Sequence, residues 1–281
     1  MKIAGQAARI GCIALFTAFS ALTAQAIRLP AAVAARKQIT VGVNGIFPPM
    51  EYKEPGSEEL IGCDVDLAKA IGQVLGVKIV FDDQKFDQLL PSVTTSRVDF
   101  VLSGLSDKEA RRKSFDFIDY FNSGTVAYTT REQFKTINSL ESLSGKTLAV
   151  SAATDYRTEI QKWSKDNLEA KGKAAIIILP TDSEPTARLQ MVQGRANASA
   201  ISPEVFGWLE KTSPGKFQAF GPILNPSPYG ICFRKDNVEL RNAVLAAVKE
   251  LIRNGTYTRI LAKWELGRSA VAEPLVNGQK M

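Results

Sequence analysis

The alternation of strand and helix patterns over residues 39–102 most constrains the fold of this 281-residue chain. Apolar residues alternate in short stretches typical of strands, and recur at helical spacing in the stretches between them. The expected order is strand 39–43, helix 62–76, strand 78–81, a helix near 86–94 and strand 98–102. A βαβαβ order of this kind predicts a mostly parallel sheet with helices on its faces.

A second α/β pattern follows in the next hundred residues. The expected elements are strand 144–150, helix 156–170, strand 175–179, helix 184–193 and strand 196–201. Residues 222–228 contain three prolines and are expected to form a loop, before a strand at 229–234 and a helix at 240–253. Ligands of such sheets bind beyond the carboxyl ends of the strands. Two units facing each other would therefore enclose a small molecule by hinge closure.

Residues 1–26 have the pattern of a cleaved secretory signal peptide. Lys2 and Arg9 supply a positive start, residues 12–24 are apolar, and residues 24–26 form a cleavage site of small residues. An uncleaved anchor is the alternative, but the apolar run is shorter than the roughly 20 residues of a spanning helix. Cleavage within residues 31–35 is also open, since that stretch is small and uncharged.

Charge and composition argue against several classes of function. The net charge of +6 falls to about +4 once Lys2 and Arg9 leave, and no basic block suggests nucleic acid. The chain has no histidine, which removes the commonest general base and metal ligand. We therefore expect neither a metal site nor a cofactor. Cys63 and Cys232 remain, and either a disulfide or two small buried thiols would fit an exported protein.

The segment SGLSDKEARRKSFDFIDYF, residues 103–121, carries the most functional information. It places a Ser-Gly turn, the Ser106 hydroxyl and Arg111 just past an apolar strand. The planar donors of arginine can bind both oxygens of a carboxylate, so Arg111 is a natural clamp. The alternatives are a solvated Arg-Arg-Lys helix face for Arg111, and a helix-capping role for Ser106 with Glu109.

With other landmarks in the same order, this segment resembles the ligand-binding motif of the family 3 extracellular solute-binding proteins, receptors of polar amino-acid ABC transporters. The landmarks lie at residues 47–50, 62–68, 86–91, 143–146, 194–195, 229–230 and 254–264. The resemblance implies an α/β, two-lobed periplasmic-binding-protein fold of type II, with the ligand cleft between lobes joined by a two-strand hinge. It assigns residues 38–126 and 229–267 to lobe 1, 130–225 to lobe 2, and 268–281 to a tail that we expect to be disordered.

The resemblance also assigns the binding residues. In lobe 1 the aromatic walls are Phe47 and Phe86, the backbone and hydroxyl contacts are Ser103, Gly104 and Ser106, and the carboxylate clamp is Arg111. In lobe 2 the loop before a helix supplies Ser151, Thr154 and Asp155, where a helix N-terminus favours anions. The alternatives are core positions for the two phenylalanines and a simple N-cap role for Asp155.

Two positions depart from the family pattern. Members that bind α-amino acids carry an aspartate for the ligand ammonium where this chain has Ser202, and many have an acidic residue in place of Asn44. A buried ammonium without a carboxylate is costly. The departures predict an anionic or less cationic ligand and make basic amino acids the least expected, unless a nearby carboxylate compensates. The candidates are Glu204, Asp155 and Asp182.

The expected function is that of a monomeric periplasmic receptor, not an enzyme, that delivers a small carboxylate-bearing solute to an ABC permease in the inner membrane. One alternative is an exported cyclohexadienyl dehydratase, which resembles these receptors and eliminates water and carbon dioxide from prephenate or arogenate. That chemistry needs a general acid in a dry cleft. Another is a sensor that presents its closed form to a chemoreceptor.

Overall fold

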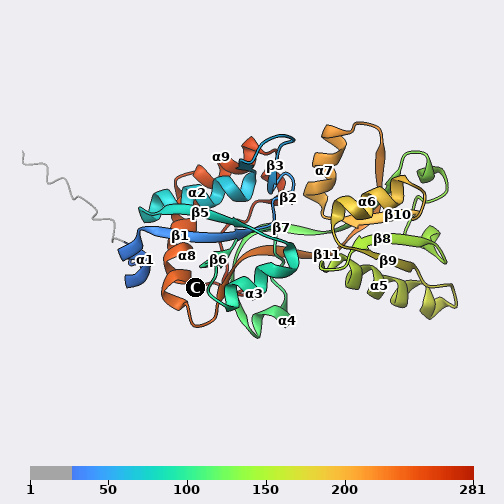
Figure 1. The fold of residues 1–281 in the computed structure, drawn as a ribbon. Coiled ribbons are helices and arrows are strands. Elements are labelled where there is room, and N and C mark those ends of the chain that lie inside the picture. Colours follow the sequence, from blue (N-terminus) through green and yellow to red (C-terminus); the bar gives the residue numbers. More distant parts are fainter. Residues whose placement is uncertain (1–26) are drawn as a thin grey trace, which may run out of the picture.

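The computed structural model describes residues 27–281, so the expected signal peptide at 1–26 lies outside the described residues. Two α/β lobes lie side by side, and two long strands run from one into the other (Figure 1). Among the described residues, no helix is long and apolar enough to cross a membrane.

The helices are α1 (Ala31–Arg36), α2 (Cys63–Leu75), α3 (Leu89–Thr94), α4 (Glu109–Arg112), α5 (Tyr156–Asn167), α6 (Glu184–Val192), α7 (Pro203–Thr212), α8 (Val238–Arg253) and α9 (Thr256–Lys263). The strands are β1 (Gln38–Val43), β2 (Ile46–Phe47), β3 (Glu51–Lys53), β4 (Leu60–Ile61), β5 (Lys78–Asp83), β6 (Phe100–Val101), β7 (Phe115–Thr130), β8 (Thr147–Ser151), β9 (Ile177–Thr181), β10 (Ala198–Ile201) and β11 (Phe217–Arg234).

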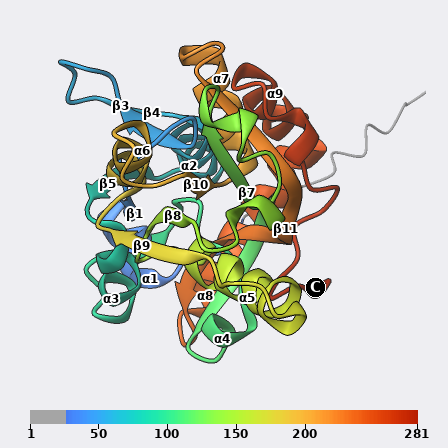
Figure 2. The same cartoon turned by 90° about the vertical axis from the view of Figure 1, so that its right-hand side faces the viewer.

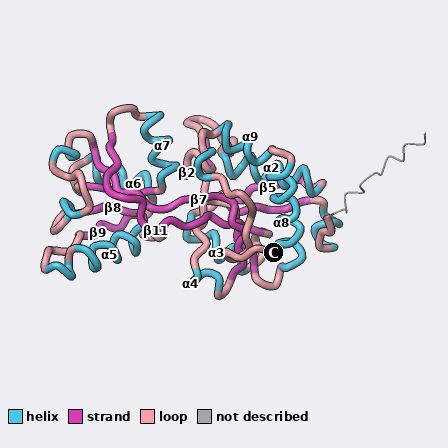
Figure 3. The backbone as a smooth tube through the Cα atoms, turned by 180° about the vertical axis from the view of Figure 1, so that it is seen from behind, coloured by secondary structure: helices cyan, strands magenta, loops and turns pink. Residues whose placement is uncertain are grey.

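The strands β7 and β11 form the hinge. The main sheet has the order β5-β1-β6-β11-β7-β10-β8-β9, in which β11 and β7 are antiparallel neighbours through both lobes (Figure 3). Phe121 pairs with Tyr229 on the lobe 1 side, and Thr125 pairs with Leu224 on the lobe 2 side. The chain therefore crosses between the lobes on these two paired strands, which confirms the two-lobed fold.

The proline-rich stretch 222–228 was expected to be a loop, and this expectation is wrong. Its residues lie within β11, whose pairing with β7 continues on both sides. Proline cannot donate to a strand ladder, and the pairing shifts register between Phe220 and Leu224 and again between Leu224 and Ser227. The prolines thus interrupt the ladder at the crossing between the lobes without ending the strand.

Helices cover both faces of each part of the sheet. In lobe 1, α2, α8 and α9 pack over β1 through residues such as Leu67, Ile71 and Val244, and α3 packs on the other face. In lobe 2, α5 lies on one side of β8–β10 and α6 on the other (Figure 2). Helix α7, which the sequence patterns did not indicate, begins at Pro203, a residue whose fixed φ suits a first helical position.

The tail at residues 268–281 is ordered, contrary to expectation. The Asp119 N–H donates to the Leu275 carbonyl at 2.8 Å, and the Phe117 N–H donates to Asn277 Oδ1 at 2.9 Å. Val276 is buried beside Ile118. The tail is held because it satisfies backbone donors of β7, which would otherwise have no strand partner on that side.

Cys63 and Cys232 are both free and buried, so the disulfide alternative is not what the structure has. The two residues belong to different hydrophobic clusters, Cys63 with α2 and Cys232 with α3. Burial raises the pKa of both thiols, which keeps them protonated and unreactive.

Thiol titration should count two thiols per chain in protein that begins at residue 27. We expect both to react after unfolding without reductant and neither to react in the folded protein, because each sulfur is enclosed by apolar side chains. A count of zero in the unfolded, unreduced protein would restore the disulfide.

Candidate functional site

A cavity of about 320 Å³ lies between the lobes, a size that suits a small ligand. Lobe 1 contributes the loops after β1, β5 and β6, and lobe 2 contributes the loops after β8 and β9. These are the carboxyl ends of parallel strands, where ligands of α/β sheets bind. The lining residues that the sequence analysis assigned are Asn44, Phe47, Phe86, Gly104, Ser106, Ser151, Thr154 and Asp155.

Three assigned residues are not on the cavity wall: Ser103, Arg111 and Ser202. Ser103 is buried with its hydroxyl bonded to Glu51, and Arg111 is paired with Asp155. Ser202 is fully buried at the start of α7. The structure therefore brings most of the assigned residues together, and it places these three behind the wall.

The Ser103–Gly104 turn has a geometry that only glycine allows at its second residue. Gly104 has φ of +52°, and a Cβ there would lie 2.6 Å from the Phe47 ring. The Ser103 hydroxyl donates to Glu51 at 2.5 Å, and the Gly104 N–H donates to Asp64 at 3.0 Å. The turn thus packs against the Phe47 ring on the cavity side and is held by hydrogen bonds to Glu51 and Asp64 on the other side.

The two acids below the turn, Glu51 and Asp64, are fully buried. Desolvation raises the pKa of both, to about 7 for Asp64, and the neighbouring Asp64 charge raises that of Glu51 further. The Tyr120 hydroxyl donates to Asp64 at 2.7 Å. Since two adjacent buried carboxylates cannot both ionise at low cost, the pair holds a proton and supports the turn as a neutral or singly charged unit.

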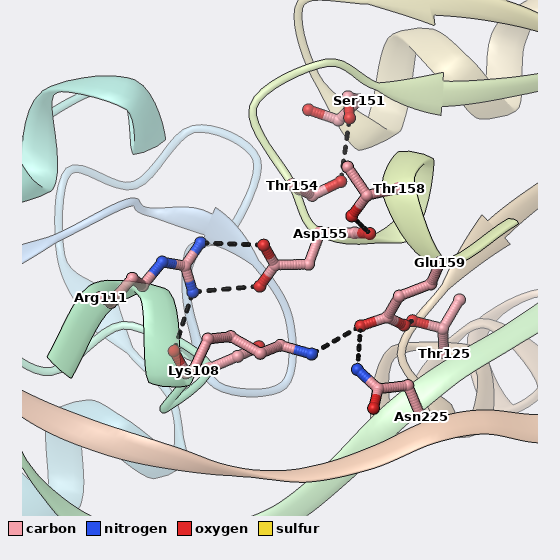
Figure 4. Close-up of polar contacts among 10 residues, drawn as sticks. Lys108, Arg111, Thr125, Ser151, Thr154, Asp155, Thr158, Glu159 and Asn225 are labelled. Atoms are coloured by element: carbon pink, nitrogen blue, oxygen red, sulfur yellow. Dashed lines mark hydrogen bonds and ion pairs between the residues drawn. The ribbon is translucent and has the colours of Figure 1, made fainter. Parts of the chain in front are cut away.

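The guanidinium of Arg111 faces lobe 2 (Figure 4). Its Nη1 lies 3.0 Å from Asp155 Oδ2, its Nη2 donates to Asp155 Oδ1 at 3.2 Å, and Nη1 also donates to the Ser106 carbonyl at 2.8 Å. Asp155 sits at the N-cap position of α5 without a side-chain capping bond, so the N-cap alternative does not hold. Ser106 makes no capping box either, because α4 begins at Glu109 with Lys108 as its N-cap.

A second ion pair joins the lobes beside the first. Lys108 Nζ lies 2.6 Å from Glu159 Oε1, and Asn225 Nδ2 donates to the same oxygen at 2.8 Å (Figure 4). The Thr125 hydroxyl donates to the other oxygen. Asn225 and Thr125 belong to the hinge strands, so Glu159 is fixed at the base of lobe 2 and Lys108 reaches it from lobe 1.

The lobes also touch where α7 faces β3 and α9. The rings of Tyr52 and Trp208 lie 5.3 Å apart, and Tyr52 lies 6.2 Å from Trp264. Lys211 and Glu265 form an ion pair at 2.5 Å. The cavity is therefore bounded by interlobe contacts from two sides, as expected when hinge closure encloses a small molecule.

The position assigned to the ligand ammonium in lobe 2 belongs to a buried polar cluster instead. Glu204 accepts from the Tyr229 hydroxyl at 2.7 Å and from Ser123 at 2.9 Å. Burial raises the Glu204 pKa, and Ser202 lies close enough to lower it in part. Neither Glu204 nor Ser202 lines the cavity, so the Glu204 carboxylate does not reach a ligand there.

Glu184 is a carboxyl group on the cavity wall that the sequence analysis did not name. It lines the cavity as the first residue of α6, together with Asp87, Asp182 and Lys85. Desolvation and the charge of Glu204 raise its pKa to about 8, against the opposing effects of Arg188 and Tyr156. The sequence could have indicated Glu184, because it lies just past the carboxyl end of the strand β9 and directly after the helix-capping Ser183.

The model of the bacterial extracellular solute-binding proteins, family 3, matches residues 39–267. The chain belongs to this family. The match confirms the resemblance seen in the sequence, and this family 3 protein shares its two-lobed fold with solved members.

Three named proteins are similar to this chain over most of its length. The arginine-binding protein ArgT of Corynebacterium glutamicum is 34% identical over 90% of this chain and 82% of its own length. An ancestral arginine-binding protein, solved bound to arginine, is 31% identical with a TM-score of 0.73, over 82% of this chain and 98% of that one. The ancestral amino acid-binding protein AncCDT-1, described as a precursor of cyclohexadienyl dehydratase, is 28% identical with a TM-score of 0.72, over 83% and 97%.

Proposed function

We propose that this family 3 protein is a monomeric periplasmic receptor that closes on an amino acid with a cationic side chain and delivers it to an ABC permease. The charge of the cavity wall carries the proposal. Asp87 and Asp182 line the wall with one lysine, Lys85, and Glu184 adds a carboxyl group that a bound cation would ionise, whereas the charge of Asp155 is paired by Arg111. The arginine ligand of two similar proteins supports the same solute class, and L-arginine is the first candidate.

The cavity offers a partner for each part of such a ligand. The side chains of Phe47 and Phe86 can take an alkyl chain or stack on a guanidinium. Glu184 and Asp182 can pair a positive group, and a carboxylate can approach Arg111 where Asp155 now meets it. Binding across the two lobes favours the closed form that a permease would receive.

This proposal reverses the ligand charge inferred from Ser202 and Asn44. That inference held that no residue at the matched positions supplies a negative charge. The acids come instead from other positions on the cavity wall, Asp182 and Glu184, which lie after β9 on the loop before α6 and at its first residue. The sequence left open that a nearby carboxylate compensates. Of the three candidates, Asp182 is the one that lines the cavity and forms no ion pair among the described residues.

A thermal-shift screen should give its largest shift with L-arginine. A hundredfold excess over Kd adds about 2.7 kcal/mol to the free energy of unfolding, roughly 5–10 °C for a chain of this size. The screen should include lysine, glutamine, cystine, dicarboxylates, keto acids and prephenate. Shifts confined to amine-free acids would refute the cationic solute and reinstate the anionic one.

A dehydratase remains the second candidate, because Glu184 meets its main requirement. A carboxyl group with a pKa of about 8 is protonated at neutral pH, as a general acid must be, and Glu184 lines the cavity between the lobes. Turnover of prephenate or arogenate, lost in Glu184→Gln, would move the protein to the enzyme class. Binding without turnover would leave the receptor function in place.

A further inference from the structure

The Arg111–Asp155 pair has the geometry of a bound ligand carboxylate. Both carboxylate oxygens of Asp155 meet the two terminal nitrogens of Arg111, at 3.0 and 3.2 Å (Figure 4). Their side chains are 16% and 26% exposed, so the pair is partly withdrawn from water. A carboxylate of a bound ligand would pair with the same two terminal nitrogens of the Arg111 guanidinium.

A second carboxylate cannot join this pair at low cost. Arg111 Nη1 already donates to the Ser106 carbonyl as well, which leaves the terminal donors shared between two protein acceptors. Two carboxylates against one guanidinium would also repel each other, and like charges held together at an interface are unfavourable. A ligand carboxylate must therefore move Asp155 or bind Arg111 less well.

The Asp155 side chain can leave Arg111 without disrupting the start of α5 or the contact between the lobes, because other interactions hold both. It makes no capping bond to α5, and its backbone carbonyl accepts from Thr158 independently of the side chain. The Lys108–Glu159 pair is fixed to the hinge strands through Asn225 and lies off the cavity wall. Displacing Asp155 therefore breaks one interlobe ion pair and leaves the other.

We propose that Asp155 is an internal competitor for the carboxylate clamp and so determines how much a ligand's carboxylate adds to affinity. The inference rests on the proposed function for its choice of probes. Its consequence is selective. Removing the Asp155 charge strengthens binding of ligands that carry a carboxylate and leaves the corresponding amines unchanged.

The test compares Asp155→Asn with wild type by calorimetry at pH 7, using L-arginine and agmatine, its decarboxylated form. L-glutamine and 4-aminobutanamide form a second such pair with an uncharged side chain. Asp155→Asn should tighten L-arginine by about tenfold, a value between those of an exposed and a buried ion pair, and agmatine by less than threefold. Asp155→Ser should act in the same direction, since it also removes the charge.

Two control variants separate this effect from general changes. Asp166→Asn makes the same chemical change on the exposed face of α5 and should alter neither affinity. Glu159→Gln removes the other interlobe ion pair and should weaken L-arginine and agmatine alike. Equal effects of Asp155→Asn on acid and amine, or none on either pair, would overturn the inference. A gain seen only with L-glutamine would support it and refute the cationic solute.

Discussion

Replacing Arg111 with alanine should weaken binding of an amino acid by at least about 100-fold while the protein still folds. Truncating one partner of a partly buried charge pair costs about 2–5 kcal/mol in binding, and about 2.7 kcal/mol corresponds to 100-fold. The loss has two sources here. The ligand carboxylate loses its cation, and Asp155, which meets Arg111 at 3.0 Å, is left as an unpaired anion facing that carboxylate.

A double-mutant cycle separates the two sources. Calorimetry on Arg111→Ala, Asp155→Ala and the double variant should show the double variant binding more tightly than Arg111→Ala alone, because the repelling carboxylate is gone. Arg97→Ala is the matched control, since Arg97 is exposed and pairs with Asp82 away from the cavity. Retention of affinity within a few-fold in Arg111→Ala would show that the clamp assignment is wrong.

The fold was predictable where local pattern and global packing agree. The period of apolar residues located α2 and its end at Gly76, which is left-handed in the structure. The same reasoning failed for β11, because proline signals a break in a strand and the hinge tolerates a broken ladder there. It failed for the tail as well, since no pattern in residues 268–281 indicates that the Asn277 side chain will accept a hydrogen bond from a backbone N–H of β7.

The site was predictable where backbone geometry decides a residue's role. Gly104, which the resemblance assigned, lines the cavity with a positive φ that few residues other than glycine allow, whereas Ser103, assigned with it, lies behind the wall and donates to Glu51. Charge partners could not be assigned, because they depend on how two lobes meet. The Arg111–Asp155 pair joins residues 44 positions apart, and the raised pKa of Glu184 arises from the burial and the neighbours that the fold supplies.

The affinity for L-arginine should rise with pH between 6 and 8 if Glu184 pairs the cationic ligand. Its pKa is about 8, so at pH 6 nearly all of the free protein carries a protonated, neutral Glu184. A cation binds the ionised form, and the apparent Kd scales inversely with the ionised fraction, which grows roughly 50-fold over this range. Above pH 8 the ionised form dominates and the affinity should level off.

Glu184→Gln isolates this contribution. Glutamine keeps the size of the side chain but cannot ionise, so the variant should bind L-arginine at least about 30-fold more weakly at pH 8, a loss of about 2 kcal/mol. It should show little difference from wild type at pH 6. Asp64, whose pKa of about 7 also falls in this window, is present in both proteins, so the difference between their profiles reports Glu184 alone.

The choice of ligand shows which positive group Glu184 meets. L-citrulline has the shape of arginine with an uncharged side chain, and both amino acids keep their α-ammonium over this range. A pH dependence seen with arginine and absent with citrulline would place the guanidinium at Glu184, whereas the same dependence with both would place the α-ammonium there. Glu210→Gln, on the exposed face of α7, is the matched control. Identical pH profiles in wild type and Glu184→Gln would exclude Glu184 from ligand recognition, because no other change distinguishes the two proteins.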